Sequence, residues 1–143
     1  MPKQNLVRVH GTTIAWGGCG ALLIGASGSG KSALALHLMA LGCDLIADDQ
    51  SELRVDNGAL VATCPQTIIG KIEARGFGIL NSAAQTRVNL CCCVDLDTPE
   101  TKRLPPERFI NFLDQDLRLF HKPAIEVLPF ALLQYLKSQQ LSF

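Results

Sequence analysis

The sequence predicts one α/β domain built around a mixed β-sheet. Its 143 residues are the size of a single domain and suffice to bury a core without disulfide bonds. An apolar run, a glycine-rich loop and an amphipathic helix follow one another between Cys19 and Leu41, as in α/β proteins. Several hairpin signals argue against a purely parallel sheet, and no linker divides the chain. We therefore expect one domain that covers residues 1–143.

The first elements are expected to be strands. Leu6–Val9 and Thr12–Trp16 are short runs of β-forming residues on either side of His10-Gly11, which indicates a β-hairpin. Gly17-Gly18 is a further turn signal. Cys19–Ile24 has the composition of a buried strand.

A helix is expected after the glycine-rich loop. Lys31–Leu41 places Leu34, Leu38 and Leu41 at three- and four-residue spacings, so these side chains share one face. Gly42 fits the end of this helix, because helices commonly stop at a glycine.

The rest of the chain predicts more strands and a last helix. Asp44–Ala47 is a short apolar strand, and Leu53–Val55 and Leu60–Cys64 flank an Asn57-Gly58 turn, a strong hairpin signal. The later elements are expected to be a central strand at Val88–Leu96, a loop at Pro99–Pro106, short strands at Phe109–Phe112 and Leu117–Phe120, and a helix at Leu128–Ser138.

Charge and hydropathy exclude several classes of protein. Thirteen Lys and Arg balance thirteen Asp and Glu, which argues against a general binder of nucleic acids or anionic membranes. A local phosphate site remains compatible with this balance. No run approaches the roughly 18–20 apolar residues of a membrane span, and Met1–Val9 lacks the apolar core of a signal peptide. We expect a cytoplasmic protein.

The six cysteines are expected to be reduced and to fill the core. They form no Cys-x-x-Cys motif, and no histidine lies near them, so a zinc site is not indicated. The run Cys91–Cys93 lies inside the apolar stretch Val88–Leu96. A redox or metal role for this run is the alternative.

The strongest motif is a phosphate-binding loop. Its eight residues are Gly25-Ala26-Ser27-Gly28-Ser29-Gly30-Lys31-Ser32, which match G-x-x-x-x-G-K-[ST] between a strand and a helix. Glycines let backbone N–H groups surround a phosphate chain, and the helix N-terminus adds partial positive charge. Lys31 would reach the β- and γ-phosphates, and the Ser32 hydroxyl would bind Mg²⁺. The alternative is a Gly/Ser-rich loop that only caps the helix.

Acidic residues at strand ends are the next candidates. Asp48-Asp49 follows the strand after the helix, where one carboxylate could hold the metal and its neighbour act as a base. Which of the two is the base stays open, and a turn or helix cap is the alternative. Asp95 and Asp97 also end an apolar run, but a solvated strand end is the simpler interpretation.

Together these motifs resemble the catalytic domain of HPr kinase/phosphorylase. The resemblance runs from Val7 to Leu96 and rests on His10-Gly11, the P-loop, Leu45–Asp49 and Ile72–Asn81 in this order. It implies a P-loop fold of the phosphoenolpyruvate carboxykinase type. It also implies a bacterial protein-serine kinase that uses ATP and Mg²⁺ to phosphorylate HPr, the phosphocarrier of the sugar phosphotransferase system. Phosphorolysis of the phosphoserine is the family's reverse reaction.

The resemblance also implies roles for individual residues. Lys31 corresponds to the catalytic lysine, and Asp49 to the proton acceptor of the kinase direction. His10 corresponds to the catalytic histidine, and Asp48 is expected to orient the site or to contact metal-bound water. The remaining implied residues are the magnesium ligands Ser32 and Glu73, and Arg75 in the signature stretch Glu73–Ser82.

Two departures separate this chain from typical members of the family. Only nine residues precede His10, so we expect a short form that lacks the N-terminal domain. No motif places an arginine loop after Pro105, although Arg108 and Arg118 are present, so the phosphorylase direction is less supported than the kinase direction. The final helix packs either in the core or in a subunit interface, since family members form hexamers.

Two other functions compete with the kinase. One is a nucleotide-sensing module without catalysis, suggested by the missing arginine loop. The other is a small-molecule kinase, which would need an arginine-rich lid that the sequence does not show.

Overall fold

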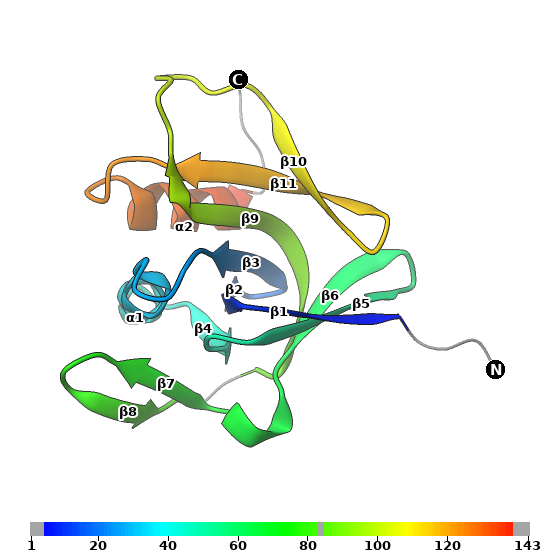
Figure 1. The fold of residues 1–143 in the computed structure, drawn as a ribbon, viewed down its shortest axis with the longest axis vertical. Coiled ribbons are helices and arrows are strands. Elements are labelled where there is room, and N and C mark those ends of the chain that lie inside the picture. Colours follow the sequence, from blue (N-terminus) through cyan, green and yellow to red (C-terminus); the bar gives the residue numbers. More distant parts are fainter. Residues whose placement is uncertain (1–4, 83–84, 139–143) are drawn as a thin grey trace.

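A computed structural model describes residues 5–82 and 85–138 (Figure 1). In chain order its elements are β1 (Leu6–Val9), β2 (Gly11–Trp16), β3 (Cys19–Ile24), α1 (Lys31–Ala40), β4 (Asp44–Ala47), β5 (Ser51–Asp56), β6 (Ala59–Thr63), the 3-10 turn η1 (Gln66–Ile68), β7 (Lys71–Ala74), β8 (Gly78–Asn81), β9 (Arg87–Pro99), β10 (Arg108–Phe112), β11 (Gln115–Lys122) and α2 (Leu128–Ser138).

The main sheet is mixed, as the sequence predicts. Its strands follow the order β1-β5-β6-β9-β3-β2-β4, while β11 pairs with β9 and β10 pairs with β11. The long strand β9 is the centre, because it pairs in parallel with β3 and β11 and antiparallel with β6. Three pairs of strands are joined by hairpins and run antiparallel: β2 with β3, β5 with β6, and β10 with β11. This confirms that the sheet is not a purely parallel, doubly wound one.

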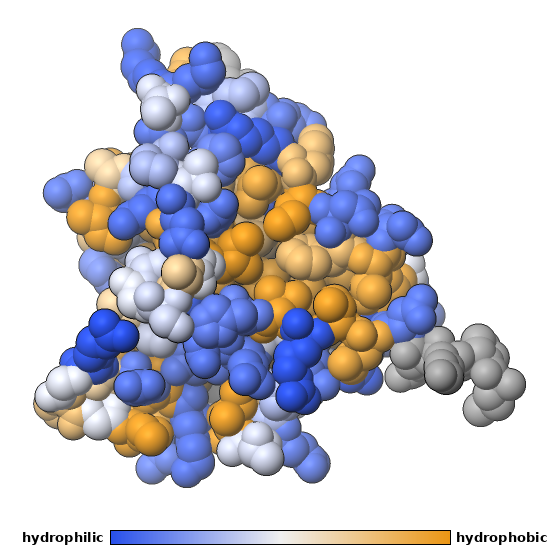
Figure 2. Space-filling view, viewed as in Figure 1, coloured by the Kyte–Doolittle hydropathy of each residue, from blue (hydrophilic) through white to orange (hydrophobic). Residues whose placement is uncertain are grey.

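Alternating side chains divide the core between the two faces of this sheet. On β3, Ala21 and Leu23 pack with leucines of α1 and α2, whereas Leu22 faces the opposite side. On β9, Cys92 joins the helix-covered face and Cys93 the other face. Neither described helix contributes to the second cluster, and Figure 2 shows an apolar patch there, between the β5–β6 and β10–β11 hairpins.

Most predicted elements are confirmed within a residue or two. The hairpin of β5 and β6 turns at Asn57 and Gly58, both with positive φ (51° and 77°), as an Asn-Gly turn requires. The short strands β10 and β11 form, and α2 buries Leu128, Leu132, Leu133 and Leu136 in the core. The two strands of the signature stretch, β7 and β8, form a separate small sheet below α1 (Figure 1).

The predicted hairpin across His10-Gly11 is wrong. Gly11 belongs to β2, so only His10 separates β1 from β2, and one residue is too short for the usual hairpin turn. Instead, β1 pairs with β5, and β2 forms its hairpin with β3 across the Gly17-Gly18 turn.

The expectation of six reduced cysteines is wrong for two of them. Cys19 and Cys91 form a disulfide, with a Cα–Cα distance of 5.7 Å. The register of β3 and β9 shifts after Gly20, so Cys91 falls in a bulge beside Cys19. The other four cysteines are free and buried, as predicted, and burial raises the pKa of Cys43 and Cys64 to about 11.

Within the described chain, no helix is long and apolar enough to cross a membrane.

Candidate active site

The phosphate-binding loop connects β3 to α1. Gly25, Gly28 and Gly30 have φ values of 153°, 85° and 99°, which residues with a side chain rarely adopt. A Cβ atom on Gly25 would lie 2.6 Å from the Ser29 hydroxyl oxygen, so this position also lacks space. Gly30 is the N-cap of α1, and its carbonyl accepts the amide of Leu34. The backbone therefore forms the compact loop that the motif predicts.

A cavity of about 410 Å³ opens in front of this loop. The loop, the first turn of α1, the end of β4 and the end of β7 form its walls. Its lining residues are Ser27, Gly28, Gly30, Lys31, Ser32, Ala33, Leu36, Asp48, Asp49, Glu73, Ala74 and Arg75. Most residues predicted for the site thus surround one cavity, although they come from three separate segments.

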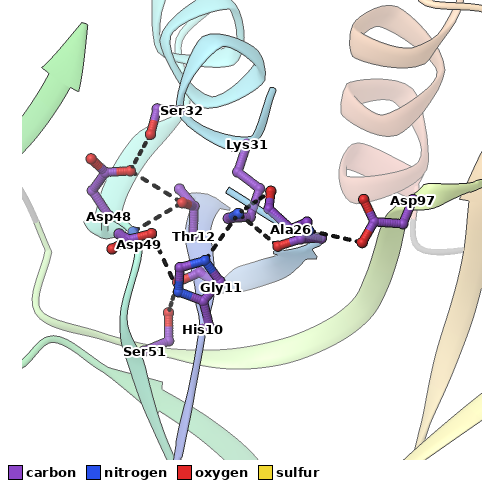
Figure 3. A network of polar contacts seen from close by, with 11 residues as sticks. His10, Gly11, Thr12, Ala26, Lys31, Ser32, Asp48, Asp49, Ser51 and Asp97 are labelled. Carbon is purple, nitrogen blue, oxygen red and sulfur yellow. Dashed lines mark hydrogen bonds and ion pairs between the residues drawn. The ribbon is translucent and has the colours of Figure 1, made fainter. Parts of the chain in front are cut away.

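Lys31 is buried at the base of the loop. Its ammonium group donates to the carbonyl oxygens of Gly25 (2.7 Å) and Ala26 (3.0 Å) and lies 3.4 Å from His10 Nε2 (Figure 3). Only 5% of Lys31 is exposed, so its ammonium group is buried against the loop backbone.

His10 connects Lys31 to Asp49. An ammonium group can only donate, so His10 Nε2 is the acceptor and the proton of the neutral ring is assigned to Nδ1. That Nδ1 lies 3.4 Å from Asp49 Oδ1, so the ring can donate toward this carboxylate (Figure 3). The family resemblance predicted His10 in the site, and in the structure its ring lies 3.4 Å from both Lys31 and Asp49.

Asp48 is buried and accepts three hydrogen bonds. Its Oδ1 accepts the hydroxyls of Ser32 (2.7 Å) and Thr12 (3.1 Å), and its Oδ2 accepts the backbone amide of Glu73 (3.0 Å). These contacts tie the first turn of α1, strand β2 and strand β7 to one carboxylate. Asp48 is therefore an organising group of the site.

Asp49 is in a different environment. Its side chain is 59% exposed, its φ is 67°, and its amide donates to Thr12 Oγ1 at 3.0 Å. Asp48 and Asp49 both line the cavity, but the left-handed backbone lets consecutive side chains point apart, so Asp48 is buried in its wall while Asp49 is exposed. Asp49 is the carboxylate that a bound group can reach.

Strand β7 and the residue that follows it supply the remaining predicted residues. Glu73 and Arg75 line the cavity, and the Arg75 guanidinium is 3.7 Å from where a Cβ of Gly28 would lie. The Arg75 cation therefore lies beside the loop at Gly28.

Oxygen ligands for a divalent cation are present in this cavity. Ser32, Asp48 and Glu73 line it together, and such hard oxygen donors suit Mg²⁺. Across residues 5–82 and 85–138, no group of three or more His, Cys, Asp or Glu side chains is arranged for a metal. Mg²⁺ usually completes its shell with water and substrate phosphates, so this donor set fits it.

Sequence reasoning missed Thr12 and undervalued Asp97. Thr12 is fully buried and bonds both acidic residues, but a threonine in a β-forming run carries no signal of this role. Asp97 is exposed, as expected of a solvated strand end, but it also accepts the backbone amide of Ala26 at 2.8 Å and so holds the loop (Figure 3). The sequence showed only that Asp97 follows an apolar run, and the structure adds that this run pairs in parallel with β3.

Comparison with known proteins gives one consistent family. The model of the HPr Serine kinase C-terminal domain matches residues 4–89. The chain is 42% identical over 74 residues to an HPr kinase/phosphorylase of Clostridium botulinum, covering 52% of this chain and 24% of that protein. It is 39% identical over 97 residues to the Geobacillus enzyme, covering 62% and 31%.

A solved structure extends the likeness beyond the matched segment. The Hpr(Ser) kinase/phosphatase of Coxiella burnetii superimposes with a TM-score of 0.77 at 22% identity, covering 93% of this chain and 89% of that chain. The fold is therefore shared over most of the chain, including the part beyond residue 89. The chain itself spans only about a quarter to a third of the two curated relatives named above.

Proposed function

Because the chain belongs to the family of HPr serine kinase C-terminal domains, we propose that it is an ATP-dependent protein kinase that phosphorylates a serine of HPr. The observation that best supports this proposal is that two adjacent carboxylates have different environments. Asp48 is buried and accepts three hydrogen bonds, whereas Asp49 is exposed in the same cavity as the P-loop lysine. A phosphate site and an available base therefore share one space.

Nucleotide binding follows from the loop. Its backbone amides and the N-terminus of α1 favour a phosphate chain, and Lys31 adds a full positive charge. Lys31 already donates to two loop carbonyls, so it is oriented before any ligand arrives. Ser32 and Glu73, with Asp48 behind them, would hold Mg²⁺, which would neutralise charge on the transferred phosphoryl group.

Transfer needs a group that takes the seryl proton. Asp49 accepts this proton as the seryl oxygen bonds to the γ-phosphorus and ADP departs. His10 Nδ1, at 3.4 Å from Asp49 Oδ1, orients the carboxylate. Arg75, whose guanidinium lies beside Gly28 of the loop, would contact the phosphates there. Lys31, Ser32, Asp48 and His10 each have a side-chain contact that positions them for these roles.

The test is phosphate transfer to HPr from labelled ATP in the presence of Mg²⁺. Asp49→Asn should lower the rate at least about 100-fold, the usual contribution of a general base, with the affinity for ATP changed only a few-fold. Asp114→Asn is a matched control, because Asp114 lies in the β10–β11 turn outside the site.

Two results would contradict the proposal. A fully active Asp49→Asn variant would exclude Asp49 as the base. Tight binding of ATP without transfer to HPr would instead support a nucleotide-sensing module.

A further inference from the structure

A second cavity lies on the opposite side of β9, far along the chain from the phosphate-binding loop. It has a volume of about 190 Å³ and lies between α2, β11 and the connection that follows β9. Its lining residues all fall between Val94 and Tyr135, outside the segment that the family model matches. Nothing in the proposed kinase chemistry uses this cavity.

The interior of this cavity is apolar. Val94, Leu128 and Leu132 are at most 4% exposed and form its floor. The rings of Phe120 and Tyr135 meet edge to face, with 5.0 Å between their centroids. An apolar protein cavity of about 150 Å³ can hold benzene, so this one accommodates a six-membered ring with a short substituent.

The mouth of the cavity is positively charged. Lys102 and Arg103 line it, and neither forms an ion pair with any residue that the structure describes. His121 also lines it. Unpaired cations beside an apolar interior attract an anion whose body is apolar.

One carboxylate, Glu100, also lines the cavity, but its charge is neutralised. The Arg108 guanidinium forms an ion pair with Glu100, and the backbone amides of Thr101 and Lys102 donate to it. The hydrogen bond from Arg108 is the largest of the effects that lower the pKa of Glu100. Glu100 thus fixes the connection after β9, and Lys102 and Arg103 set the local charge.

We propose that this cavity binds a small monocarboxylic acid with one aromatic ring or a branched apolar body. The body lies against Phe120, Leu132 and Tyr135, and the carboxylate lies at Lys102 and Arg103. An inorganic phosphate would leave the apolar interior unfilled, and a neutral hydrocarbon would make no use of the cationic mouth.

Calorimetric titration of the full chain with phenylacetate, 4-methylpentanoate and the neutral isostere phenylacetamide tests this. At least one acid should bind, and phenylacetate about 5- to 10-fold more tightly than the amide, as expected for a charge-assisted contact near the surface. If neither acid binds, or if inorganic phosphate binds as tightly, the proposal is overturned.

Variants separate the two parts of the site. Lys102→Gln combined with Arg103→Gln should reduce the preference for acid over amide to within about 2-fold, while Lys71→Gln, at an exposed position of β7, should leave it unchanged. Ala131→Leu, at an exposed position of α2 that lines the cavity, should abolish binding of all three probes without unfolding the helix. Binding that survives Ala131→Leu would place the ligand elsewhere and overturn the proposal.

Discussion

At the scale of single residues, one backbone turn gives two neighbouring carboxylates separate tasks. Asp48 directly follows β4 and is buried, and the positive φ of Asp49 turns the next side chain outward. The sequence placed both acids at the site but left open which one is the base, because adjacency along the chain does not reveal burial. The three donors that Asp48 satisfies come from residues 16, 36 and 25 positions away.

Thr12 should matter for stability although it has no part in phosphate transfer. Thr12→Val keeps the shape of the side chain but removes the hydroxyl that donates to Asp48 and accepts from the amide of Asp49. Loss of these buried bonds should lower the free energy of unfolding by about 1–3 kcal/mol in urea titrations.

Thr63→Val is the matched control for that change. The Thr63 hydroxyl makes one long contact, 3.4 Å to the carbonyl of Glu52, on a half-buried strand position. We expect a change within about 0.5 kcal/mol there. Equal effects of the two substitutions would contradict the special role of Thr12.

Asp97 should position the phosphate-binding loop through its contact with the amide of Ala26. Two substitutions separate this contact from the charge of Asp97. Asn keeps an acceptor and removes the charge, whereas Ala removes both. Asp97→Ala should therefore bind ATP about 2- to 10-fold more weakly than Asp97→Asn in a fluorescence titration. Identical affinities of the two variants would show that the contact does not hold the loop.

The residues that the sequence identified correctly share one property. The P-loop has fixed spacing within eight residues, so its pattern reports its geometry directly. Thr12 and Asp97 act across 36 and 71 positions, and no local pattern encodes such contacts. His10, Glu73 and Arg75 were found only because a family resemblance supplies long-range information.

At the scale of elements, local signals predicted where strands occur better than which strands pair. The Asn57-Gly58 turn correctly joined β5 to β6, because a two-residue turn fixes both partners. The run Leu6–Val9 was also a strand, but its partner β5 lies more than forty positions away in the register. Pairing of that kind depends on the whole sheet.

The parallel pair β3 and β9 carries both the phosphate-binding loop and Asp97, so its close packing should be sensitive to added volume. A Cβ atom on Gly20 of β3 would lie 2.5 Å from Val88 Cγ1 and 3.1 Å from the carbonyl of Asn89. Val88 is buried and branched at Cβ, so it cannot move aside easily. Gly20→Ala should lower the free energy of unfolding by about 1–3 kcal/mol in urea titrations.

Gly18 is the control for this substitution. It lies in the adjacent turn with no atom within 4 Å of an added Cβ and no positive φ. Gly18→Ala should change stability by less than about 0.5 kcal/mol. If Gly20→Ala is as well tolerated as Gly18→Ala, β3 and β9 are not packed as closely as described.

At the scale of the whole molecule, the two cavities use different segments of the chain. The first is lined by the glycine-rich loop, α1, the residues after β4 and the end of β7, whereas the apolar cavity is lined by β11, α2 and the connection after β9. The family match covers the first half and the structural likeness covers both. This explains why the sequence predicted the candidate site around the glycine-rich loop in detail and gave little about the C-terminal half.

The disulfide between Cys19 and Cys91 spans the first half of the molecule. The two cysteines are separated by 72 positions, and the loop between them contains the P-loop, α1 and strands β4 to β8. Closing a loop of this length restricts the unfolded chain, so reduction should lower the free energy of unfolding by up to about 4 kcal/mol. Urea titration with and without dithiothreitol measures this difference.

Thiol counting supplies the independent check. With the disulfide intact, alkylation in denaturant should label the four free thiols, and after reduction it should label all six cysteines. In the folded protein at pH 8, burial and the raised pKa of Cys43 and Cys64, about 11, keep these thiols protonated and slow to react. A Cys19→Ala/Cys91→Ala variant should show no dependence on dithiothreitol. If the untreated protein labels at six positions and is equally stable with reductant, the two strands are held by packing and hydrogen bonds alone, as the sequence composition suggested.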